Sequence, residues 1–442
     1  MPRLQLITLG CSKNRVDSEH LLARAEAAGW DILPESADLA TAGVDTVLIN
    51  TCGFIGDAKE ESINVILEAA QAKQEGFIKR LLVFGCLSQR YRDELPGLIP
   101  EADRFYSLAE TSQLKADLGI TDTQPDLIYT GRSLTTPGHF AYLKISEGCD
   151  RRCSYCAIPL IRGPHVSVPE EVLLREASSL AAKGVRELIL IAQDTTWYGL
   201  DLCGKRTLAR LMRRLSEIDG IDWIRLHYSY PDGFPEDVLE EMASNPKICK
   251  YIDIPLQHSE DAVLKAMRRS VDGAQTRALV EKFREKVPGV VLRTTMMVGH
   301  PGEGEEEFES LLDFVRQYRF ERLGAFQYSE EEGTWGAAHL KDDVPAEVKQ
   351  ERYDRLMEVQ SLISEDYNVS RIGSRERVLV DSFTDGVLVA RSQFESPEVD
   401  GEILIGDAAS LAGLDTAGII GNFVNVRIKS ASEYDLLAEI EQ

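Results

Sequence analysis

No stretch of the 442-residue sequence approaches the roughly 18 to 20 uninterrupted apolar residues that a membrane-spanning helix requires. The amino terminus, MPRLQLITLGC, has no long apolar segment before a small-residue cleavage site, so it does not resemble a secretion signal. We therefore expect a cytoplasmic protein that makes no contact with a membrane.

Basic residues are scarce relative to acidic ones. The chain has 49 Lys and Arg against 73 Asp and Glu, which gives a formal net charge of -24 and a pI near 4.8. Such a chain repels the phosphates of nucleic acids unless a local basic patch overrides the overall field. An acidic surface instead favours basic partners, and these are often proteins.

Cysteine is sparse as well, with eight residues in the whole chain. This number is too small for a disulfide scaffold of this length. In a reducing compartment, clustered cysteines are more often metal ligands or catalytic groups, so their positions decide the interpretation. The length and the 43% content of apolar residues are sufficient for two or three packed domains.

The hydrophobic pattern divides the chain into three folded regions and predicts an α/β protein. Residues 1–118 alternate strand and helix, which predicts a parallel sheet covered by helices on both faces. Residues 119–138 have little periodicity and are interpreted as a linker. The same alternation returns in residues 139–370, and residues 371–442 contain short alternating runs separated by Gly-rich turns, which predict a small antiparallel β-barrel.

The central region contains six predicted strands separated by amphipathic helices. Six such units predict a partial (βα)6 barrel rather than the closed barrel of eight units. The predicted strands cover residues 140–146, 187–193, 223–228, 251–257, 290–298 and 323–328.

Three cysteines lie on one short loop directly after the first of these strands. Cys149, Cys153 and Cys156 stand in EGCDRRCSYCAIP, with the spacing C-x3-C-x2-C. A structural zinc site needs four ligands, and the nearest histidine, His165, lies in a different segment. A cubane iron-sulfur cluster held by three thiolates keeps one iron open for a ligand. A zinc site and three incidental thiols remain alternatives.

Three further cysteines are far apart in sequence but occupy equivalent positions. Cys11, Cys52 and Cys86 each follow a predicted parallel strand of the first region, and each adjoins a glycine. Ligands of open α/β sheets gather at the carboxyl ends of the strands, so these thiols can meet there. Free cysteine is also a common buried apolar residue, so the spacing alone leaves both interpretations open.

The loop motif, with an aromatic residue before its last cysteine, resembles that of the radical S-adenosylmethionine enzymes. The segments TLGCSKNRVDSE, INTCGFIGDAKEES and VFGCLSQRY resemble the amino-terminal domain of the methylthiotransferase subfamily. This resemblance spans all three regions, because the subfamily carries a small TRAM barrel at its carboxyl end. It implies two 4Fe-4S clusters, one on each set of three cysteines, and places Tyr155 beside the adenine. Cys203 and Cys249 are interpreted as ordinary thiols.

The resemblance also implies a mechanism. S-adenosylmethionine serves as the radical source and as the methyl donor, and an external one-electron reductant supplies the electron. The adenosyl radical removes a hydrogen from the target carbon, which then receives a methylthio group from the second cluster.

Two branches of the subfamily modify different targets, and the charge of the tail distinguishes them. From Gly373 to Gln442 there are five basic and thirteen acidic residues, a net charge of -8 in 70 residues. Such a tail is a poor match for RNA, whereas ribosomal proteins are strongly basic. Segments such as DIPLQH and SPEVDGEI also resemble the branch that modifies the β-carbon of an aspartate in the twelfth small-subunit ribosomal protein. The alternative is a tRNA adenosine methylthiotransferase.

The same branch assignment predicts how the substrate is bound. The basic ribosomal protein would dock on an acidic tail surface that includes Glu398, Asp400 and Glu402, and RNA contact is expected only through the ribosome. A surface acid can also serve solubility alone.

Other candidate residues lie at or just beyond the carboxyl ends of predicted barrel strands, the rim where barrel sites are built. By resemblance, most of these contact S-adenosylmethionine, and Asp194 contacts the substrate. Turn formation or helix capping explains each of them equally well. One departure from the family pattern is His300, where an apolar residue is usual. The candidates are Gln193, Asp194, Arg225, Gly299 and Pro301.

Overall fold

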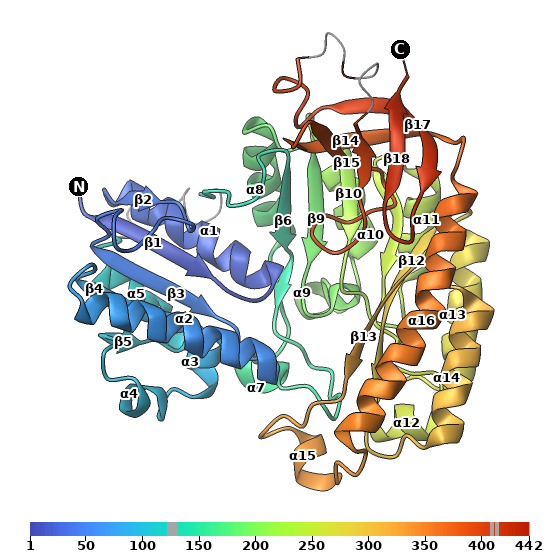
Figure 1. Cartoon of the computed structure of the whole chain (residues 1–442), viewed down its shortest axis with the longest axis horizontal. Coiled ribbons are helices and arrows are strands. Elements are labelled where there is room, and N and C mark those ends of the chain that lie inside the picture. Colours follow the sequence, from blue (N-terminus) through green and yellow to red (C-terminus); the bar gives the residue numbers. More distant parts are fainter. Residues whose placement is uncertain (122–130, 407–410, 412–414, 442) are drawn as a thin grey trace.

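Three main sheets follow one another along the chain in the computed structural model (Figure 1). The structure describes residues 1–121, 131–406, 411 and 415–441. The expected α/β class and the order of a parallel sheet, a partial barrel and a small closed barrel are confirmed. The described part of the linker, residues 131–138, begins beside a buried ion pair, and residues 122–130 lie outside the described residues. No helix within the described ranges is both long enough and apolar enough to cross a membrane.

The first sheet has five parallel strands in the order β2-β1-β3-β4-β5. Its central strands are buried because helices cover both faces, and the apolar residues of these strands pack into the two cores beneath the helices. The strands are β1 (Arg3–Thr8), β2 (Asp31–Leu33), β3 (Thr46–Thr51), β4 (Arg80–Gly85) and β5 (Arg104–Phe105). The helices are α1 (Ser12–Ala27), α2 (Gly56–Gln74), α3 (Cys86–Arg90), α4 (Leu95–Leu98) and α5 (Thr111–Asp117).

The central sheet has six parallel strands, and their order in the sheet follows their order in the sequence. They are β6 (Phe140–Lys144), β9 (Glu187–Ile191), β10 (Trp223–Leu226), β11 (Ile248–Asp253), β12 (Val291–Val298) and β13 (Arg322–Gln327). The predicted strand 251–257 begins three residues earlier and ends at Asp253, because Pro255 has no N–H group to continue the ladder. The short strands β7 (Ser146–Glu147) and β8 (Val166–Ser167) pair with each other beside this sheet.

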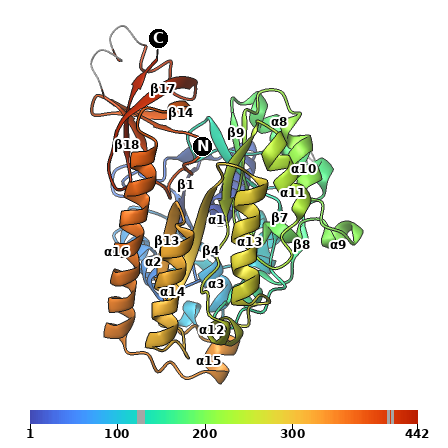
Figure 2. The same cartoon turned by 90° about the vertical axis from the view of Figure 1, so that its right-hand side faces the viewer.

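Helices cover one face of the central sheet, where they form the largest apolar core. Figure 2 shows the long helix α16 (Ala346–Ser370) running beside β13 toward the carboxyl-terminal barrel. The other helices of this region are α7 (Ile158–Arg162), α8 (Glu170–Ala182), α9 (Leu200–Cys203), α10 (Leu208–Ser216), α11 (Glu236–Ser244), α12 (Asp261–Ala266), α13 (Gly273–Lys286), α14 (Glu305–Tyr318) and α15 (Trp335–His339).

The carboxyl-terminal barrel closes in the order β14-β15-β16-β18-β17. All its strand pairs are antiparallel except β16 with β18, which run parallel. Alternating apolar residues fill its interior, as the sequence pattern predicts. The strands are β14 (Arg375–Thr384), β15 (Val387–Arg391), β16 (Ile403–Ile405), β17 (Phe423–Ala431) and β18 (Leu436–Ile440).

Ion pairs join the first sheet to the central region. Glu331, only 2% exposed, accepts from Lys59 at 2.9 Å and from Arg90 at 2.8 Å. Arg132 is fully buried between Glu19 of α1 and Glu176 of α8, so the described end of the expected linker is held firmly in place. Because each of these charges has lost water, its partner is needed to keep it stable in the interior.

Buried arginine–carboxylate pairs also join the carboxyl-terminal barrel to the central sheet. Glu395 is 1% exposed and accepts from Arg371 and Arg322. Burial by itself raises the pKa of the Glu395 carboxyl, but the charges of Arg371 and Arg322 outweigh it and lower the pKa from 4.5 to about 2. The ionised carboxylate therefore stabilises this junction.

We predict that Glu395→Gln lowers stability at neutral pH and reduces its dependence on acid. The folded pKa lies below the unfolded value of 4.5, so this contribution is complete above pH 4.5 and is lost as the pH falls toward 2. It amounts to about 3 kcal/mol at pH 7. Urea unfolding at pH 7 and pH 3 measures the difference between variant and wild type. The exposed Glu217→Gln is the control, and equal midpoints for Glu395→Gln and wild type at pH 7 would contradict the prediction.

Candidate functional site

The loop that carries Cys149, Cys153 and Cys156, called the loop trio below, is held by backbone hydrogen bonds to distant segments. The Cys149 N–H donates to the Gly163 carbonyl at 3.0 Å, and the Ser154 N–H donates to the Met267 carbonyl at 2.9 Å. The Ser154 carbonyl in turn accepts from the Gly336 N–H at 2.7 Å. These backbone bonds hold the loop at the carboxyl end of β6.

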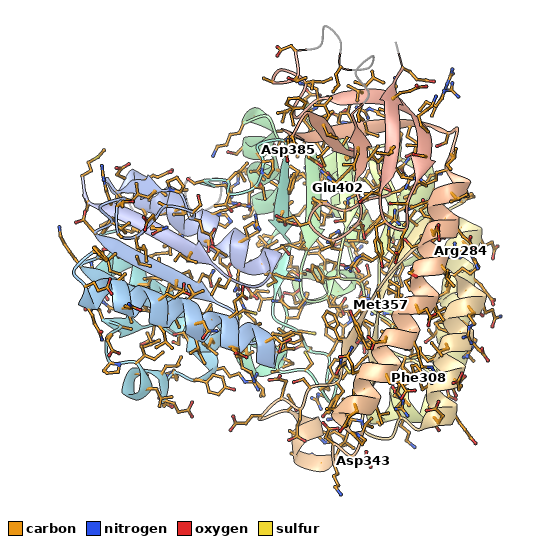
Figure 3. All side chains as sticks on the ribbon, in the orientation of Figure 1. Arg284, Phe308, Asp343, Met357, Asp385 and Glu402 are labelled. Carbon is orange, nitrogen blue, oxygen red and sulfur yellow. The ribbon has the colours of Figure 1, made fainter. Side chains whose placement is uncertain are left out.

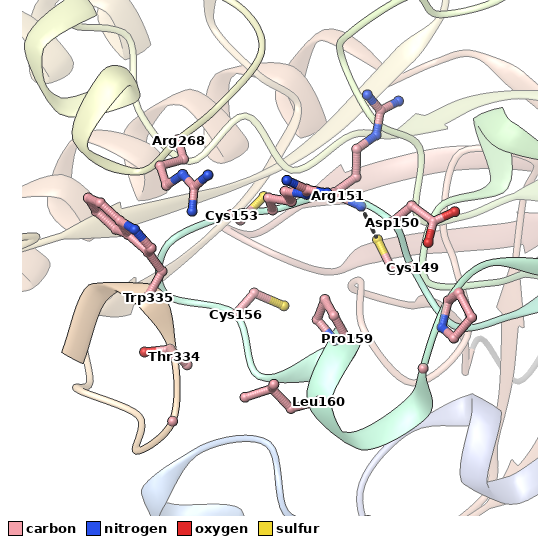
Figure 4. A pocket seen from close by; sticks show the side chains of 14 residues that line it. Cys149, Asp150, Arg151, Cys153, Cys156, Pro159, Leu160, Arg268, Thr334 and Trp335 are labelled. Carbon is pink, nitrogen blue, oxygen red and sulfur yellow. Dashed lines mark hydrogen bonds between the residues drawn. The ribbon is translucent and has the colours of Figure 1, made fainter. Parts of the chain in front are cut away.

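The loop trio lines an open pocket of about 440 Å³. Figure 4 shows the three cysteine side chains around this pocket, with Arg268 and Trp335 on one side. Arginines are prominent in the wall, and cations favour a group that carries the negative charge of bound thiolates. The lining residues are Cys149, Asp150, Arg151, Arg152, Cys153, Cys156, Pro159, Leu160, Gly163, Pro164, Arg268, Gly333, Thr334 and Trp335.

Two thiols of the loop trio, Cys149 and Cys156, are weaker acids than a free cysteine. Burial raises the pKa of Cys149 to about 12 and raises that of Cys156 further above its ordinary value. A metal ligand must be a thiolate, so a positive centre among these sulfurs has to supply the missing charge. The Cys153 Sγ lies 3.7 Å from the Tyr230 hydroxyl and 3.7 Å from Nη1 of Arg269.

The first sheet brings Cys11, Cys52 and Cys86, called the amino-terminal trio below, to one edge. Cys11 immediately precedes α1, Cys52 follows β3, and Cys86 begins α3. A Cβ on Gly10 would lie 2.7 Å from the Cys52 Cβ, so this glycine is required beside the thiol. Burial raises the pKa of Cys86 to about 11. A Cβ on Gly53, the neighbour of Cys52, would lie 2.9 Å from the Cys86 carbonyl carbon, so these two cysteines lie on adjoining backbone segments.

The helix α7 connects the loop trio to Cys86 of the amino-terminal trio. It begins two residues after Cys156, and Ile161 of this helix packs against Cys86 together with Ala157, which directly precedes the helix. Nε of Arg162 donates to the Cys86 Sγ at 3.3 Å, and Nη1 donates to Asp17 at 2.8 Å. Cys86 therefore lies against the segment that follows the loop trio.

The donor sets fit clusters better than single ions. Among the residues that the structure describes, no three His, Cys, Asp or Glu side chains are arranged to hold one metal ion. A zinc ion draws its ligands around one centre. In a four-iron cubane each thiolate binds a different iron, so three sulfurs need only surround the cluster.

Buried polar atoms without a hydrogen-bond partner gather beyond the carboxyl ends of β6, β9, β10 and β11. Leaving such an atom unpaired costs about 1–3 kcal/mol, so their concentration at one rim indicates a site for a polar ligand. Four such residues are Ser146, Gln193, Ser229 and Ser259. His258 and Glu303 face each other, with Nε2 of His258 3.4 Å from Oε2 of Glu303.

Of the candidates beside β9 and β10, only Gln193 keeps a free acceptor. Its Nε2 donates to Glu147 at 2.7 Å, while its Oε1 is buried without a partner. The carboxylate of Asp194 is 1% exposed and accepts from Arg151 and Thr196, so it holds the cysteine loop through Arg151. Its contact with the substrate remains a prediction.

Arg225 does not lie at the rim with a free head group. It is fully buried, pairs with Glu187 at 2.7 Å and donates to the Gln393 carbonyl at 2.8 Å. The expected contact with S-adenosylmethionine or the target residue remains a prediction. The side chain points toward the carboxyl-terminal barrel because residues alternate between the two faces of a strand.

The segment after β12 has structural reasons for its unusual residues. Gly299 has φ +73, and a Cβ there would lie 2.3 Å from the Lys349 side chain. His300 is buried, and burial lowers its pKa to about 4, so it is neutral at pH 7. Its ring contacts Tyr155 edge to face at 6.5 Å, and its Nδ1 lies 2.9 Å from the Pro301 carbonyl. Roles of Tyr155, Gly299 and Pro301 in cofactor binding remain predictions.

The acidic tail surface needs one correction. The Asp400 side chain is 2% exposed and accepts from the Tyr251 hydroxyl at 2.6 Å, so it belongs to the interior. Glu398 is partly exposed but accepts from Tyr142 and Arg15. Glu402 is exposed, and Figure 3 labels it with Asp385 on the carboxyl-terminal barrel.

Several residues around the trios were not predicted from the sequence. Arg162 stands six residues after Cys156 in AIPLIRGP, and its charge close to the motif was a usable signal. Arg269 and Tyr230 reach Cys153 from other strand–helix units, and no local pattern indicates this contact.

We predict that Gly148→Ala destabilises the protein more than Gly163→Ala. Both glycines have φ +75, so both substitutions incur backbone strain of about 1–3 kcal/mol. A Cβ on Gly148 would also lie 2.0 Å from the Pro164 carbonyl oxygen, whereas a Cβ on Gly163 has open space. Urea midpoints of the two variants measure the difference. Equal midpoints would show that the cysteine loop moves freely.

Comparisons with known protein families cover most of the chain. A model of the radical SAM superfamily matches residues 143–315, and a TRAM domain model matches residues 372–440. Residues 3–107 match a model described as uncharacterized protein family UPF0004.

Solved structures resemble the fold at low sequence identity. TsrM from Kitasatospora setae, a radical S-adenosylmethionine methyltransferase with cobalamin and a [4Fe-4S] cluster bound, has a TM-score of 0.55 and 16% identity. The match covers 74% of this chain and 75% of that chain. The cobalamin-dependent radical enzyme OxsB has a TM-score of 0.51 at 13% identity, covering 82% of this chain and 56% of the other.

Curated relatives match along almost the entire length. The ribosomal protein uS12 methylthiotransferase RimO of Bacteroides thetaiotaomicron is 50% identical over 438 residues, 99% of this chain and 98% of that protein. RimO of Flavobacterium johnsoniae is 50% identical over 437 residues, 99% and 98% of the two chains. RimO of Cytophaga hutchinsonii is 47% identical over 438 residues, again 99% and 98%. The chain therefore belongs to the RimO family of methylthiotransferases within the radical SAM superfamily.

Proposed function

We propose that this protein transfers a methylthio group to the β-carbon of an aspartate in ribosomal protein uS12, the twelfth protein of the small subunit. The relatives that match 98% or more of their length carry this activity in their names. The observation that supports it best is the junction at α7, where Arg162 and Ile161 bring the amino-terminal trio against the segment that follows the loop trio. A single-cluster enzyme has no need of this junction.

Each trio would hold one 4Fe-4S cluster. Cys149, Cys153 and Cys156 leave one iron open for S-adenosylmethionine, and Cys11, Cys52 and Cys86 hold the second cluster. When bound, the first cluster would supply the reductive cleavage of S-adenosylmethionine, with an external reductant as the electron source. The second cluster would supply the methylthio sulfur, whose methyl group would also come from S-adenosylmethionine.

The chain's own residues bind and orient these groups. The unpartnered Oε1 of Gln193 can accept a hydrogen bond from a polar ligand at the rim. Arg269 lies 4.2 Å from the Tyr230 ring centroid and also approaches Cys153, so it lends positive charge to that sulfur. Arg162 does the same for Cys86. These contacts exclude water and hold both thiol sets in place.

The carboxyl-terminal barrel supports a protein substrate over a tRNA adenosine. All five of its basic residues form ion pairs with carboxylates of this chain, which reduces their capacity to neutralise phosphates. They are Arg375, Arg377, Arg391, Arg427 and Lys429. Acidic side chains such as Asp385 and Glu402 remain exposed. A basic ribosomal protein is attracted to such a surface, and RNA contact would come only through the ribosome.

Deletion of the gene is expected to remove one CH2S from the mass of uS12 and to leave methylthiolated tRNA nucleosides unchanged. Complementation with the wild-type gene restores the mass, since the modification replaces a hydrogen of the aspartate with a methylthio group. Mass spectrometry of purified uS12 and of digested tRNA measures both. Loss of a tRNA nucleoside with unchanged uS12 would instead establish the tRNA activity.

Cys52→Ala and Cys153→Ala are each expected to halve the iron and sulfide bound by protein purified without oxygen. Each substitution removes one of three ligands from one trio and leaves the other trio intact. Cys203→Ala is the matched control, because the exposed Cys203 lies outside both trios. Iron and acid-labile sulfide assays give the stoichiometry. A full complement of iron in Cys52→Ala would contradict the second cluster.

A further inference from the structure

Lys13 is a buried lysine beside the amino-terminal trio. It lies two residues after Cys11 in the first turn of α1 and is 7% exposed. Its ammonium nitrogen is 2.7 Å from the centroid of the Tyr228 ring. The residue keeps a small exposed fraction, so it is not completely enclosed by the protein.

Tyr228 belongs to the rim of the central sheet. It lies two residues beyond the end of β10, with φ 56, a backbone conformation that residues other than glycine rarely adopt. Its N–H donates to Asp253 at 2.9 Å and its carbonyl accepts from Thr195. The contact between Lys13 and Tyr228 therefore marks the place where the edge of the first sheet meets the rim of the partial barrel.

Neighbouring cations at this junction are neutralised by carboxylates. Arg15 pairs with Glu398 at 3.1 Å, Arg293 with Asp253 at 3.2 Å, and Arg162 with Asp17 at 2.8 Å. In the part of the chain that the structure describes, no carboxylate forms an ion pair with Lys13. The cation–π contact of Lys13 with Tyr228 contributes about 0.5–2 kcal/mol of stabilisation, less than the several kcal/mol that burial of an ammonium costs.

The helix makes this position less favourable for a lysine. The amino-terminal end of a helix carries partial positive charge, which repels a cation in its first turn. The first turn of α1 contains no acidic residue, and the Cys11 side chain forms no capping hydrogen bond. The neighbouring His227 adds no charge, because burial lowers its pKa to about 3. The positive potential around Lys13 therefore favours the binding of an anion that is not part of this chain.

We propose that Lys13 binds the side-chain carboxylate of the target aspartate and so positions its β-carbon beside the amino-terminal trio. This inference rests on the proposed function, which makes an aspartate the substrate. In an aspartate the carboxylate carbon is bonded directly to the β-carbon, so fixing the carboxylate also fixes the carbon that receives the methylthio group.

The test compares peptides that carry the target aspartate of uS12 or an asparagine in its place. With reconstituted wild-type enzyme, we expect the aspartate peptide to bind about 30-fold more tightly, as for a buried charge pair. Lys13→Met should remove this preference by weakening the aspartate peptide alone. Isothermal titration calorimetry gives the dissociation constants, and mass spectrometry gives the extent of modification.

Three controls separate substrate binding from other roles of Lys13. Lys13→Arg should restore part of the preference, because the charge returns. Lys79→Met makes the same change at an exposed lysine that precedes β4, at the opposite edge of the sheet from Cys86, and should leave the preference intact. Iron content and formation of 5'-deoxyadenosine without peptide should be unchanged in Lys13→Met, which shows that the clusters and S-adenosylmethionine are bound normally.

Two results would overturn the inference while the proposed function stands. One is a Lys13→Met enzyme that still prefers the aspartate peptide about 30-fold. The other is an equal loss of binding for both peptides, or loss of 5'-deoxyadenosine formation, which would assign Lys13 to folding or to the cofactor. Failure of the wild-type enzyme to modify the aspartate peptide would reject the proposed function itself, and the inference with it.

Discussion

The contact of Arg162 with the amino-terminal trio is the constraint on which the arrangement of the site depends. This guanidinium, at the end of α7, donates to the Cys86 sulfur and to the Asp17 carboxylate. Asp17 also binds Lys144 of β6, so one buried network joins the first sheet, the cysteine loop and the first strand of the barrel. The two thiol sets are thus held at a fixed separation by a short helix that belongs to the loop itself.

The carboxyl-terminal barrel contributes more to the structure than a docking surface. Its arginines and carboxylates reach into the central region, where Glu187 lies between Arg225 and Arg391. The loop after β15 also carries Asp400 and Glu398, which contact Tyr251 and Tyr142 of the central strands. Much of the acidic character of this domain therefore serves internal ion pairs, and only part of it remains for a basic partner.

The fold was largely readable from local patterns, because strand and helix periodicity depends on residues near one another in sequence. The six central strands occur in the expected order, and β10 begins at the predicted residue, Trp223. The strand near Asp253 was misplaced by three residues at its start, since Ile248, Cys249 and Lys250 lack a distinctive alternation. Both cysteine sets were identified from spacing, strand ends and family resemblance.

The sequence did not predict the partners of the side chains at the carboxyl ends of the central strands. Arg225 and Asp194 stand where ligand contacts are common, yet each is consumed by an ion pair with a residue at least 38 positions away. Local periodicity carries no information on such partners, because they meet only when separate strand–helix units pack. The sequence alone therefore established the thiol sets and the elements that carry them, whereas packing selected which charges neutralise one another and left Lys13 without a carboxylate among the described residues.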